Sequence, residues 1–349
     1  DITHFQALSS AMGGTVGLGN ITGVAVAFTL GGPGAIFWMW LSAVVGIATK
    51  FFTCSLAVMY RGKDSQGNLQ GGPMYVITEG LGKKWKPLAT FFCLAAMFGV
   101  LPIFQTNQLL QITREVVLIP NGLLDAAGDH FGFNLLFGIA LMAIVATVII
   151  GGIKRIGMVA SMMVPLMIVL YLGSALYVII SNIADVPGYL LIIVERAFSG
   201  QAAGGGLIGV MIIGIQRAAF SNEAGIGTEA MAHGAAKTEE PIREGLVAML
   251  GPVIDTLLVC TATAMVIMIS GVWQHTDSTG ITLTAEAFNQ TMPLLGTPIL
   301  MLCVVFFSTS TIFTMAYYGT KCAGFVFGAH RQHLYSYFYL AMIMVGAVA

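Results

Sequence analysis

Residues 12–23 read MGGTVGLGNITG, and four glycines fall within the seven positions from Gly13 to Gly19. The stretch lies between apolar segments, where lipid offers no hydrogen-bond partner to an unpaired backbone group. Glycines clustered at that depth predict either an interrupted helix, whose freed N–H and C=O groups serve a ligand, or close packing of helices through small residues. The polar Thr15 and Asn20 in the same stretch favour the interrupted helix.

The composition outside this stretch is that of a helical membrane protein. Of the 349 residues, 57% are hydrophobic and 9% are charged, whereas soluble domains carry about 25% charged residues. The apolar runs are also much longer than the alternating strands of a membrane barrel. A net charge of −1 gives no case for a nucleic-acid partner. The cysteines lie in apolar segments without a CxxC pair, and we expect free thiols at Cys54, Cys93, Cys260, Cys303 and Cys322.

Nine apolar stretches are long enough to cross a bilayer as helices of about 20 residues. They cover residues 4–30, 35–60, 88–113, 133–151, 156–181, 204–236, 246–272, 297–319 and the chain from 334 onward. Residues 187–198 and 281–295 predict short helices on the outer face, serving either as lids or as surface packing. The chain has no initiator Met and stops within an apolar run, so we expect it to lack material at both ends.

Charge in the connecting loops gives the orientation. Eleven Lys and Arg residues fall on one side of the nine segments, and two, Arg114 and Arg196, fall on the other. Because positively charged loops stay in the cytoplasm, the first segment starts there. We therefore expect a multi-pass protein of the plasma or inner membrane.

The segment at 204–236 is also rich in glycine, and it follows the first glycine-rich segment by five spans. Paired interrupted segments predict an inverted repeat with a substrate site where the repeats meet. We assign residues 1–183 to the first repeat and 184–349 to an incomplete second repeat, within one transmembrane domain. The second interruption lies either near Gly209–Gly214 or near Ser221–Gly227.

The ends of interrupted helices suit an amino acid and a cation. A half-helix N-terminus offers free N–H groups to a carboxylate, and a half-helix C-terminus offers carbonyls to sodium or an ammonium group. The eighth segment adds hydroxyls at the same depth as the first interruption. The alternative is that each hydroxyl bonds the carbonyl four residues earlier in its own helix. These hydroxyls are Ser308, Thr309, Ser310, Thr311 and Thr314.

Several other polar residues fall inside predicted spans. Gln105 lines a polar cavity or bridges helices, and we favour the cavity. We expect Lys50 to snorkel toward the cytoplasm. Arg217 and Glu223 form either an inner gate or a structural ion pair, and Asp255 is a weaker candidate for a proton relay.

Four motifs resemble the alanine/glycine:cation symporter family, also called sodium:alanine symporters. They are GGPGAIFWMWLSAVVG at 31–46, GGPMY at 71–75, FSNEAGIG at 220–227 and YYG at 317–319. The similarity extends over essentially the whole chain. This chain departs from the family pattern at Thr53, where relatives usually have Glu, and at Met315, where they usually have Trp.

The resemblance implies a leucine-transporter-type fold, an all-α membrane bundle of five plus five inverted spans in which core helices 1 and 6 are discontinuous. It implies alanine and glycine as substrates, driven by sodium, with proton coupling as the other possibility. By the same likeness the carbonyls of Gly13 and Val16 bind sodium together with Ser310 and Thr311. The implied substrate site comprises Thr15, Gly17, Gly19 and Asn20, with Gln105, Ile212, Ile213, Gly214 and Met315 closing it.

Two other functional classes are alternatives to a symporter. A membrane-embedded enzyme needs a catalytic constellation, and the sequence contains no HExxH, GxSxG or aspartate-rich motif. A channel needs a continuous polar lining. The sequence leaves open the stoichiometry, the preference for L- or D-alanine and the oligomeric state.

Overall fold

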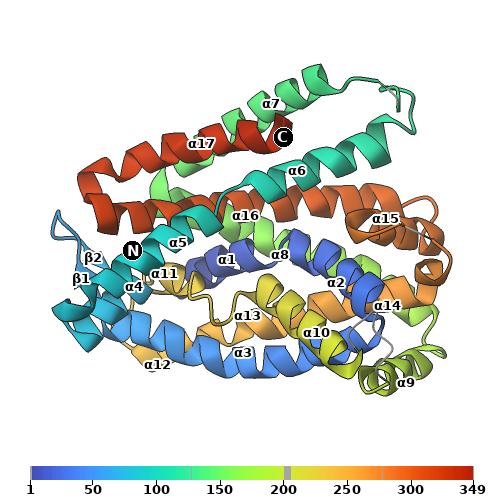
Figure 1. Cartoon of the computed structure of the whole chain (residues 1–349), viewed down its shortest axis with the longest axis horizontal. Coiled ribbons are helices and arrows are strands. Elements are labelled where there is room, and N and C mark those ends of the chain that lie inside the picture. The colour runs from blue at the N-terminus through green and yellow to red at the C-terminus, as the bar shows by residue number, and fades with distance from the viewer. Residues whose placement is uncertain (1, 127, 200–205, 277, 349) are drawn as a thin grey trace.

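The computed structural model describes residues 2–126, 128–199, 206–276 and 278–348 as one bundle of helices. Seven helical runs in this described part are long and apolar enough to cross a membrane. The long helices run roughly side by side, with the β1–β2 hairpin at one end of the bundle and α9 and α15 at the other (Figure 1). The first half of the bundle comprises α1 (His4–Thr15), α2 (Leu18–Gly31), α3 (Gly34–Met59), β1 (Gly62–Lys63), β2 (Leu69–Gln70), α4 (Pro73–Tyr75), η1 (Val76–Leu81), η2 (Lys83–Trp85), α5 (Lys86–Gly99), α6 (Ile103–Ile112), η3 (Thr113–Leu118), α7 (Phe131–Ile149) and α8 (Gly152–Ser181).

The second half has the same helical character and ends in a long helix beside α7. Its elements are α9 (Val186–Ala197), α10 (Gly206–Asn222), α11 (Glu229–His233), α12 (Pro241–Ala248), α13 (Leu250–Pro252), η4 (Val253–Cys260), α14 (Thr261–Ser270), η5 (Val272–Gln274), α15 (Gly280–Thr291), α16 (Gly296–Phe327), η6 (Ala329–Arg331) and α17 (Gln332–Val348).

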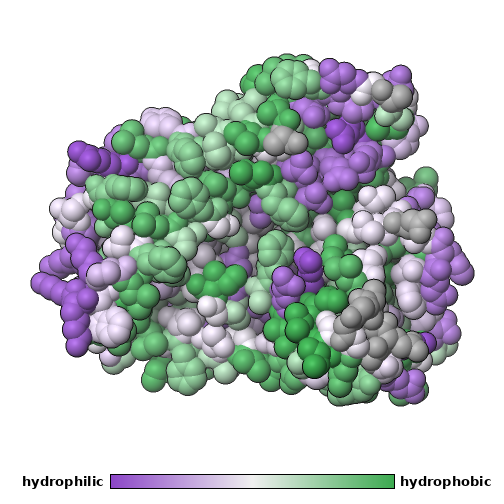
Figure 2. Space-filling view, in the orientation of Figure 1, coloured by the Kyte–Doolittle hydropathy of each residue, from purple (hydrophilic) through white to green (hydrophobic). Residues whose placement is uncertain are grey.

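The surface agrees with a membrane location. Hydrophobic residues cover much of the middle of the face in view, and hydrophilic residues gather toward the two ends of the bundle (Figure 2). Large apolar side chains such as Phe52, Phe91 and Met162 are more than half exposed on the outer helices. In lipid this exposure carries no hydrophobic penalty, because the acyl chains are as apolar as the side chains.

Seven of the nine predicted spans are found among the membrane-length helical runs of the described residues, whereas those at 204–236 and from 334 onward contain α10 and α17, which have 17 residues each. Three of the seven differ from the prediction. The span at 88–113 is divided into α5 and α6 by a turn at Pro102, which lacks the N–H that a continuous helix requires. The span at 297–319 continues to Phe327, so Lys321 belongs to α16 rather than to a loop. The run at 246–272 begins earlier, at Pro241. The two short outer helices are confirmed as α9 and α15.

The N-terminal end of α1 is connected to the loop after α11. Thr3 caps the helix: its hydroxyl accepts from the Gln6 N–H at 3.1 Å, and its own N–H donates to the Gln6 side chain at 3.0 Å. Ile2 pairs with this loop, since the Lys237 N–H donates to the Ile2 carbonyl at 2.7 Å. The imidazole rings of His4 and His233 each contact the carboxylate of Glu244, which is fully buried.

Glycines bring α3 against helices of the second half at backbone distance. A Cβ at Gly214 of α10 would overlap the carbonyl oxygen of Ala35, and a Cβ at Gly245 of α12 would lie 2.8 Å from the carbonyl oxygen of Phe51. Only glycine permits this approach. Helices α10 and α12 of the second half are thereby each packed closely against α3 of the first half.

Candidate functional site

The first helix is interrupted where its glycines predicted. The α1 helix ends at Thr15 and α2 begins at Leu18, with Val16 and Gly17 between them. The interruption lies against α16, and a Cβ at Gly17 would come 2.5 Å from the hydroxyl oxygen of Thr311. The glycine therefore allows the unwound backbone to contact a hydroxyl of a helix almost 300 residues later in the chain.

The Asn20 side chain stabilises the backbone of this interruption by hydrogen bonds. Its side-chain oxygen accepts from the Gly17 N–H at 2.8 Å, and its Nδ2 donates to Asp255 Oδ1 at 2.5 Å. The side chain is fully buried and does not line the cavity described below. The residue expected to face the substrate is thus occupied in fixing the backbone, because both ends of its amide already have partners.

The second interruption lies at the later of the two predicted positions. The α10 helix ends at Asn222 and α11 begins at Glu229. Glu223 starts the interruption with φ at +54°, which makes it the one non-glycine residue with positive φ in the described part of the chain. Gly225 and Gly227 continue it at φ of +91° and +88°. A left-handed conformation in three of five residues cannot continue a right-handed helix.

Asp255, in the π-helical η4 segment, joins the two interruptions. Ser221 at the end of α10 donates to its carboxylate at 2.8 Å, and Asn20 donates to it from the first interruption. Thr256 donates a third hydrogen bond at 2.7 Å. The carboxylate is fully buried, so these three donors replace the solvation that it loses.

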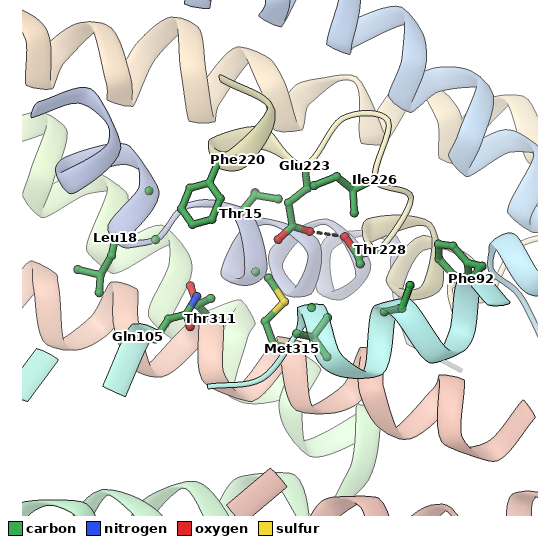
Figure 3. A pocket seen from close by; sticks show the side chains of 17 residues that line it. Thr15, Leu18, Phe92, Gln105, Phe220, Glu223, Ile226, Thr228, Thr311 and Met315 are labelled. Carbon is green, nitrogen blue, oxygen red and sulfur yellow. Dashed lines mark hydrogen bonds between the residues drawn. The ribbon is translucent and has the colours of Figure 1, made fainter. Parts of the chain in front are cut away.

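A cavity of about 420 Å³ lies between the interruptions, and α5, α6 and α16 complete its wall (Figure 3). Its volume is in the range of small-molecule sites. The lining is largely apolar, and its polar side chains are few. Thr15 is notable among them because its hydroxyl is buried and has no hydrogen-bond partner among the described residues. Of the predicted residues, those that line the cavity are Thr15, Gly17, Gly19, Gln105, Thr311 and Met315.

Three predicted residues lie elsewhere. Ile212 is 55% exposed on the outside of α10, Ile213 lies beside Gly31 and Gly214 lies against α3. Because α10 stays helical to Asn222, these positions come two turns or more before the interruption. They do not line the cavity, and Phe220 at the end of α10 takes that place instead.

The four residues of the predicted cation site lie together. A Cβ at Gly13 would be 3.6 Å from the Cβ of Ser310, and Val16 precedes the Gly17–Thr311 contact. The hydroxyls of Ser310 and Thr311 donate to the Phe307 carbonyl at 3.1 and 2.9 Å. Each hydroxyl oxygen keeps lone pairs that can accept a cation, so the donor set fits a hard ion such as sodium.

The predicted roles of three charged residues differ from their places in the structure. Glu223 forms no ion pair with Arg217 among the described residues, because it lies beyond the end of α10 and turns toward Thr228, whose hydroxyl donates to it. Lys50 is 2% exposed and therefore does not snorkel. Sequence reasoning did not place Glu223 in the cavity, although its position in a glycine-rich stretch pointed to a break in the helix.

Comparison with known proteins gives a consistent result. The family model described as the sodium:alanine symporter family matches residues 1–349. The chain is 41% identical to the sodium/alanine symporter AgcS of Methanococcus maripaludis, over 100% of this chain and 76% of that protein. It is 39% identical to the uncharacterized transporter YflA of Bacillus subtilis (99% and 72%) and 38% identical to the probable sodium/glutamine symporter GlnT of the same organism (100% and 70%).

The fold has a match among solved structures. The crystal structure of MhsT in complex with L-phenylalanine superposes with a TM-score of 0.69, at 16% identity, over 98% of this chain and 78% of that one. MhsT is a transporter of the leucine-transporter fold. The expected fold class, with discontinuous core helices, is confirmed.

Proposed function

The chain belongs to the sodium:alanine symporter family, whose members are sodium-coupled amino-acid transporters, and from that premise we propose that it imports alanine and glycine with sodium by alternating access. The observation that supports this most is the cavity between the two interruptions, with the unpartnered Thr15 hydroxyl in its wall. We further propose that it works in the plasma or inner membrane, with residues 1–183 and 184–349 as the two repeats.

We propose that the substrate carboxylate binds at the N-terminus of α2. Gly17 and Gly19 line the cavity there, and the first turn of a helix leaves its N–H groups without partners in the helix. The Gly17 N–H already donates to the Asn20 side chain, so the carboxylate would bind the N–H groups of Leu18 and Gly19. The helix dipole adds a favourable interaction with an anion at this end.

We propose that sodium binds beside the carboxylate, at the carbonyls of Gly13 and Val16 and the hydroxyls of Ser310 and Thr311. Thr311 lines the cavity as well as contacting Gly17, so one residue would adjoin both the ion and the substrate. This proximity provides a physical reason for coupling, because each ligand would stabilise the backbone geometry that the other needs.

Side-chain volume at the cavity wall would limit substrate size. Phe92, Phe220 and Met315 enter the cavity from three helices (Figure 3). We propose that this wall, rather than Ile212, Ile213 or Gly214, selects alanine and glycine over larger amino acids.

Uptake into proteoliposomes tests the proposal. Radiolabelled alanine should accumulate under an inward sodium gradient and should not accumulate under a proton gradient of the same size. Accumulation that is indifferent to sodium would rule out the sodium-coupled mechanism. Competition by unlabelled glycine, serine and glutamine would then rank the substrates, and a failure of glycine to compete would contradict the proposed selectivity.

A further inference from the structure

Glu223 is the one ionisable acidic or basic side chain among the described residues that line the cavity. Its side chain extends from the second interruption into the space between Thr15 and Met315 (Figure 3). The residue is 5% exposed, so bulk water does not solvate its charge. A buried carboxylate of this kind is costly unless a cation or hydrogen-bond donors compensate it.

The protein itself compensates Glu223 only in part. The Thr228 hydroxyl donates to one carboxylate oxygen, Oε2. No hydrogen bond reaches the other oxygen from the described residues, and no cationic side chain of the described chain lies within 4 Å. One oxygen of a buried anion is therefore available to a ligand in the cavity.

The backbone of Glu223 has a strained conformation. A non-glycine residue with φ near +54° is strained by about 1 kcal/mol or more. Glycines follow at positions 225 and 227, so the chain uses glycine for the other left-handed turns of the same interruption. Retaining a glutamate at the strained position is explained if its carboxylate has a role in the cavity.

We propose that Glu223 binds the ammonium group of the transported amino acid and so sets the requirement for a free amine. This inference rests on the proposed function and specifies the substrate class: molecules with both a carboxylate and an unsubstituted ammonium. The carboxylate of the substrate lies at the N-terminus of α2, and the ammonium lies toward Glu223, with the Thr15 hydroxyl between them as a further acceptor.

The surroundings of Glu223 suit an ammonium better than sodium. Sodium, like other hard cations, takes several oxygen ligands at once. Apart from Thr15 and Thr228, the labelled side chains around Glu223 are apolar, namely Phe220, Ile226 and Met315, and the Thr228 hydroxyl already directs its proton to the carboxylate (Figure 3). An ammonium needs few acceptors, and a charge-assisted hydrogen bond to one carboxylate oxygen is strong.

Binding to the purified, detergent-solubilised protein tests the inference. Alanine is compared with lactate, which replaces the ammonium by a hydroxyl, and with N-acetylalanine, in saturating sodium. We expect the wild type to prefer alanine strongly. Glu223→Gln should weaken alanine binding by about 10- to 100-fold, because a hydrogen bond to a charged group is lost, and should leave lactate binding nearly unchanged.

Glu229→Gln is the matched control. Glu229 is a fully buried carboxylate six residues away that does not line the cavity, so its variant should keep the preference for alanine over lactate. Glu223→Asp keeps the charge on a shorter side chain and should retain part of the preference. If Glu223→Gln binds alanine as tightly as the wild type, or loses alanine and lactate equally, the inference is wrong.

Sodium binding in the absence of amino acid separates this inference from its nearest alternative. We expect Glu223→Gln to bind sodium with wild-type affinity, and a loss of sodium affinity would assign the carboxylate to the ion instead. The same comparison with serine and glutamine and their hydroxy-acid analogues keeps the inference testable if alanine proves not to be the substrate. In that case the proposed substrate is wrong, but the role of Glu223 is still tested. A preference for the amino acid over its hydroxy-acid analogue that is lost in Glu223→Gln supports the role, and a preference that is kept contradicts it.

Discussion

Asn20 and Asp255 connect the two interrupted helices through buried hydrogen bonds, since the Asn20 Nδ2 donates to the Asp255 carboxylate at 2.5 Å and to its backbone carbonyl at 3.1 Å. The other end of the Asn20 amide fixes the Gly17 N–H, and the other oxygen of Asp255 accepts from Ser221. The unwound backbone of the first half of the chain and the end of α10 in the second half are thus joined through two side chains. We therefore expect a change in the backbone of one interruption to alter the other through this connection.

Asp255→Asn should therefore disturb both interruptions. The amide that replaces the carboxylate directs N–H donors at groups that are themselves donors, and at least one buried donor loses its acceptor. We expect a loss of stability of about 2–3 kcal/mol and weaker alanine binding, measured by thermal unfolding in detergent and by ligand-induced shifts in that transition. The exposed Asp185→Asn is the control, and equal transitions for the two variants would contradict the assignment.

Thr311→Val should raise the sodium concentration needed for half-maximal transport by about 10-fold, because it removes one ligand oxygen and keeps the volume of the side chain. The measurement is alanine uptake against sodium concentration. Thr309→Val provides the control on the same helix, since its hydroxyl donates to the Val305 carbonyl and does not line the cavity. A normal sodium response in Thr311→Val would remove Thr311 from the ion site.

Met315→Trp should narrow the cavity and sharpen its selection by size. The indole is larger than the thioether, and Met315 enters the cavity from α16. We expect inhibition of alanine uptake by glutamine to fall more than inhibition by glycine. Met315→Leu, which nearly conserves volume, should leave both unchanged. Equal inhibition by glutamine in the tryptophan variant and the wild type would show that another residue limits the pocket.

Asp64, in the β1–β2 hairpin outside the membrane, gives a prediction about pH. Its slight burial would raise the pKa of the carboxyl, but hydrogen bonds from the N–H groups of Asn68 and Gln66 and from the Gln70 side chain outweigh it and lower the pKa. A lowered pKa means that the stabilisation is present above the ordinary aspartate value of about 4 and is lost as the pH falls below it.

The corresponding experiment compares the wild type with Asp64→Asn by proteolysis of the hairpin. Asp64→Asn should be cleaved faster than the wild type at neutral pH, and the difference should shrink as the pH is lowered below about 4 with an acid-active protease. A constant difference across this range would show that the carboxylate charge does not support the hairpin.

The sequence predicted the first interruption well and the second one only in part. The glycines in 12–23 predict either an unwound backbone or close helix packing, and the polar Thr15 and Asn20 among them favour the unwound backbone that is found. In the second half, glycines occur both at 204–214 and at 225–227, and propensity cannot separate a glycine that packs from one that breaks a helix. Gly214 packs against α3, whereas Gly225 and Gly227 have positive φ.

The positions of the predicted site residues were predictable where a residue adjoins the interruption and not where tertiary contacts decide. Thr15 and Gln105 line the cavity as expected, and Ser310 and Thr311 lie beside the unwound backbone. The Asn20 side chain does not line the cavity, because its amide donates a hydrogen bond to Asp255, which lies 235 residues later in the chain. The pairing with Asp255 depends on tertiary packing and has no signal in the local sequence. The same holds for the direction of the Glu223 side chain, which is set by a backbone φ of +54°.

The glycine contacts of α3 also determine which parts of the transporter are able to move. A helix that touches its neighbours backbone to backbone at Gly214 and Gly245 has no layer of side chains whose rotamers absorb a sliding motion. We therefore expect α3, α10 and α12 to move together as one rigid unit. In the proposed alternating-access cycle, the cavity would open first to one side of the bilayer and then to the other by rotation of this unit against α8 and α16, about the unwound residues.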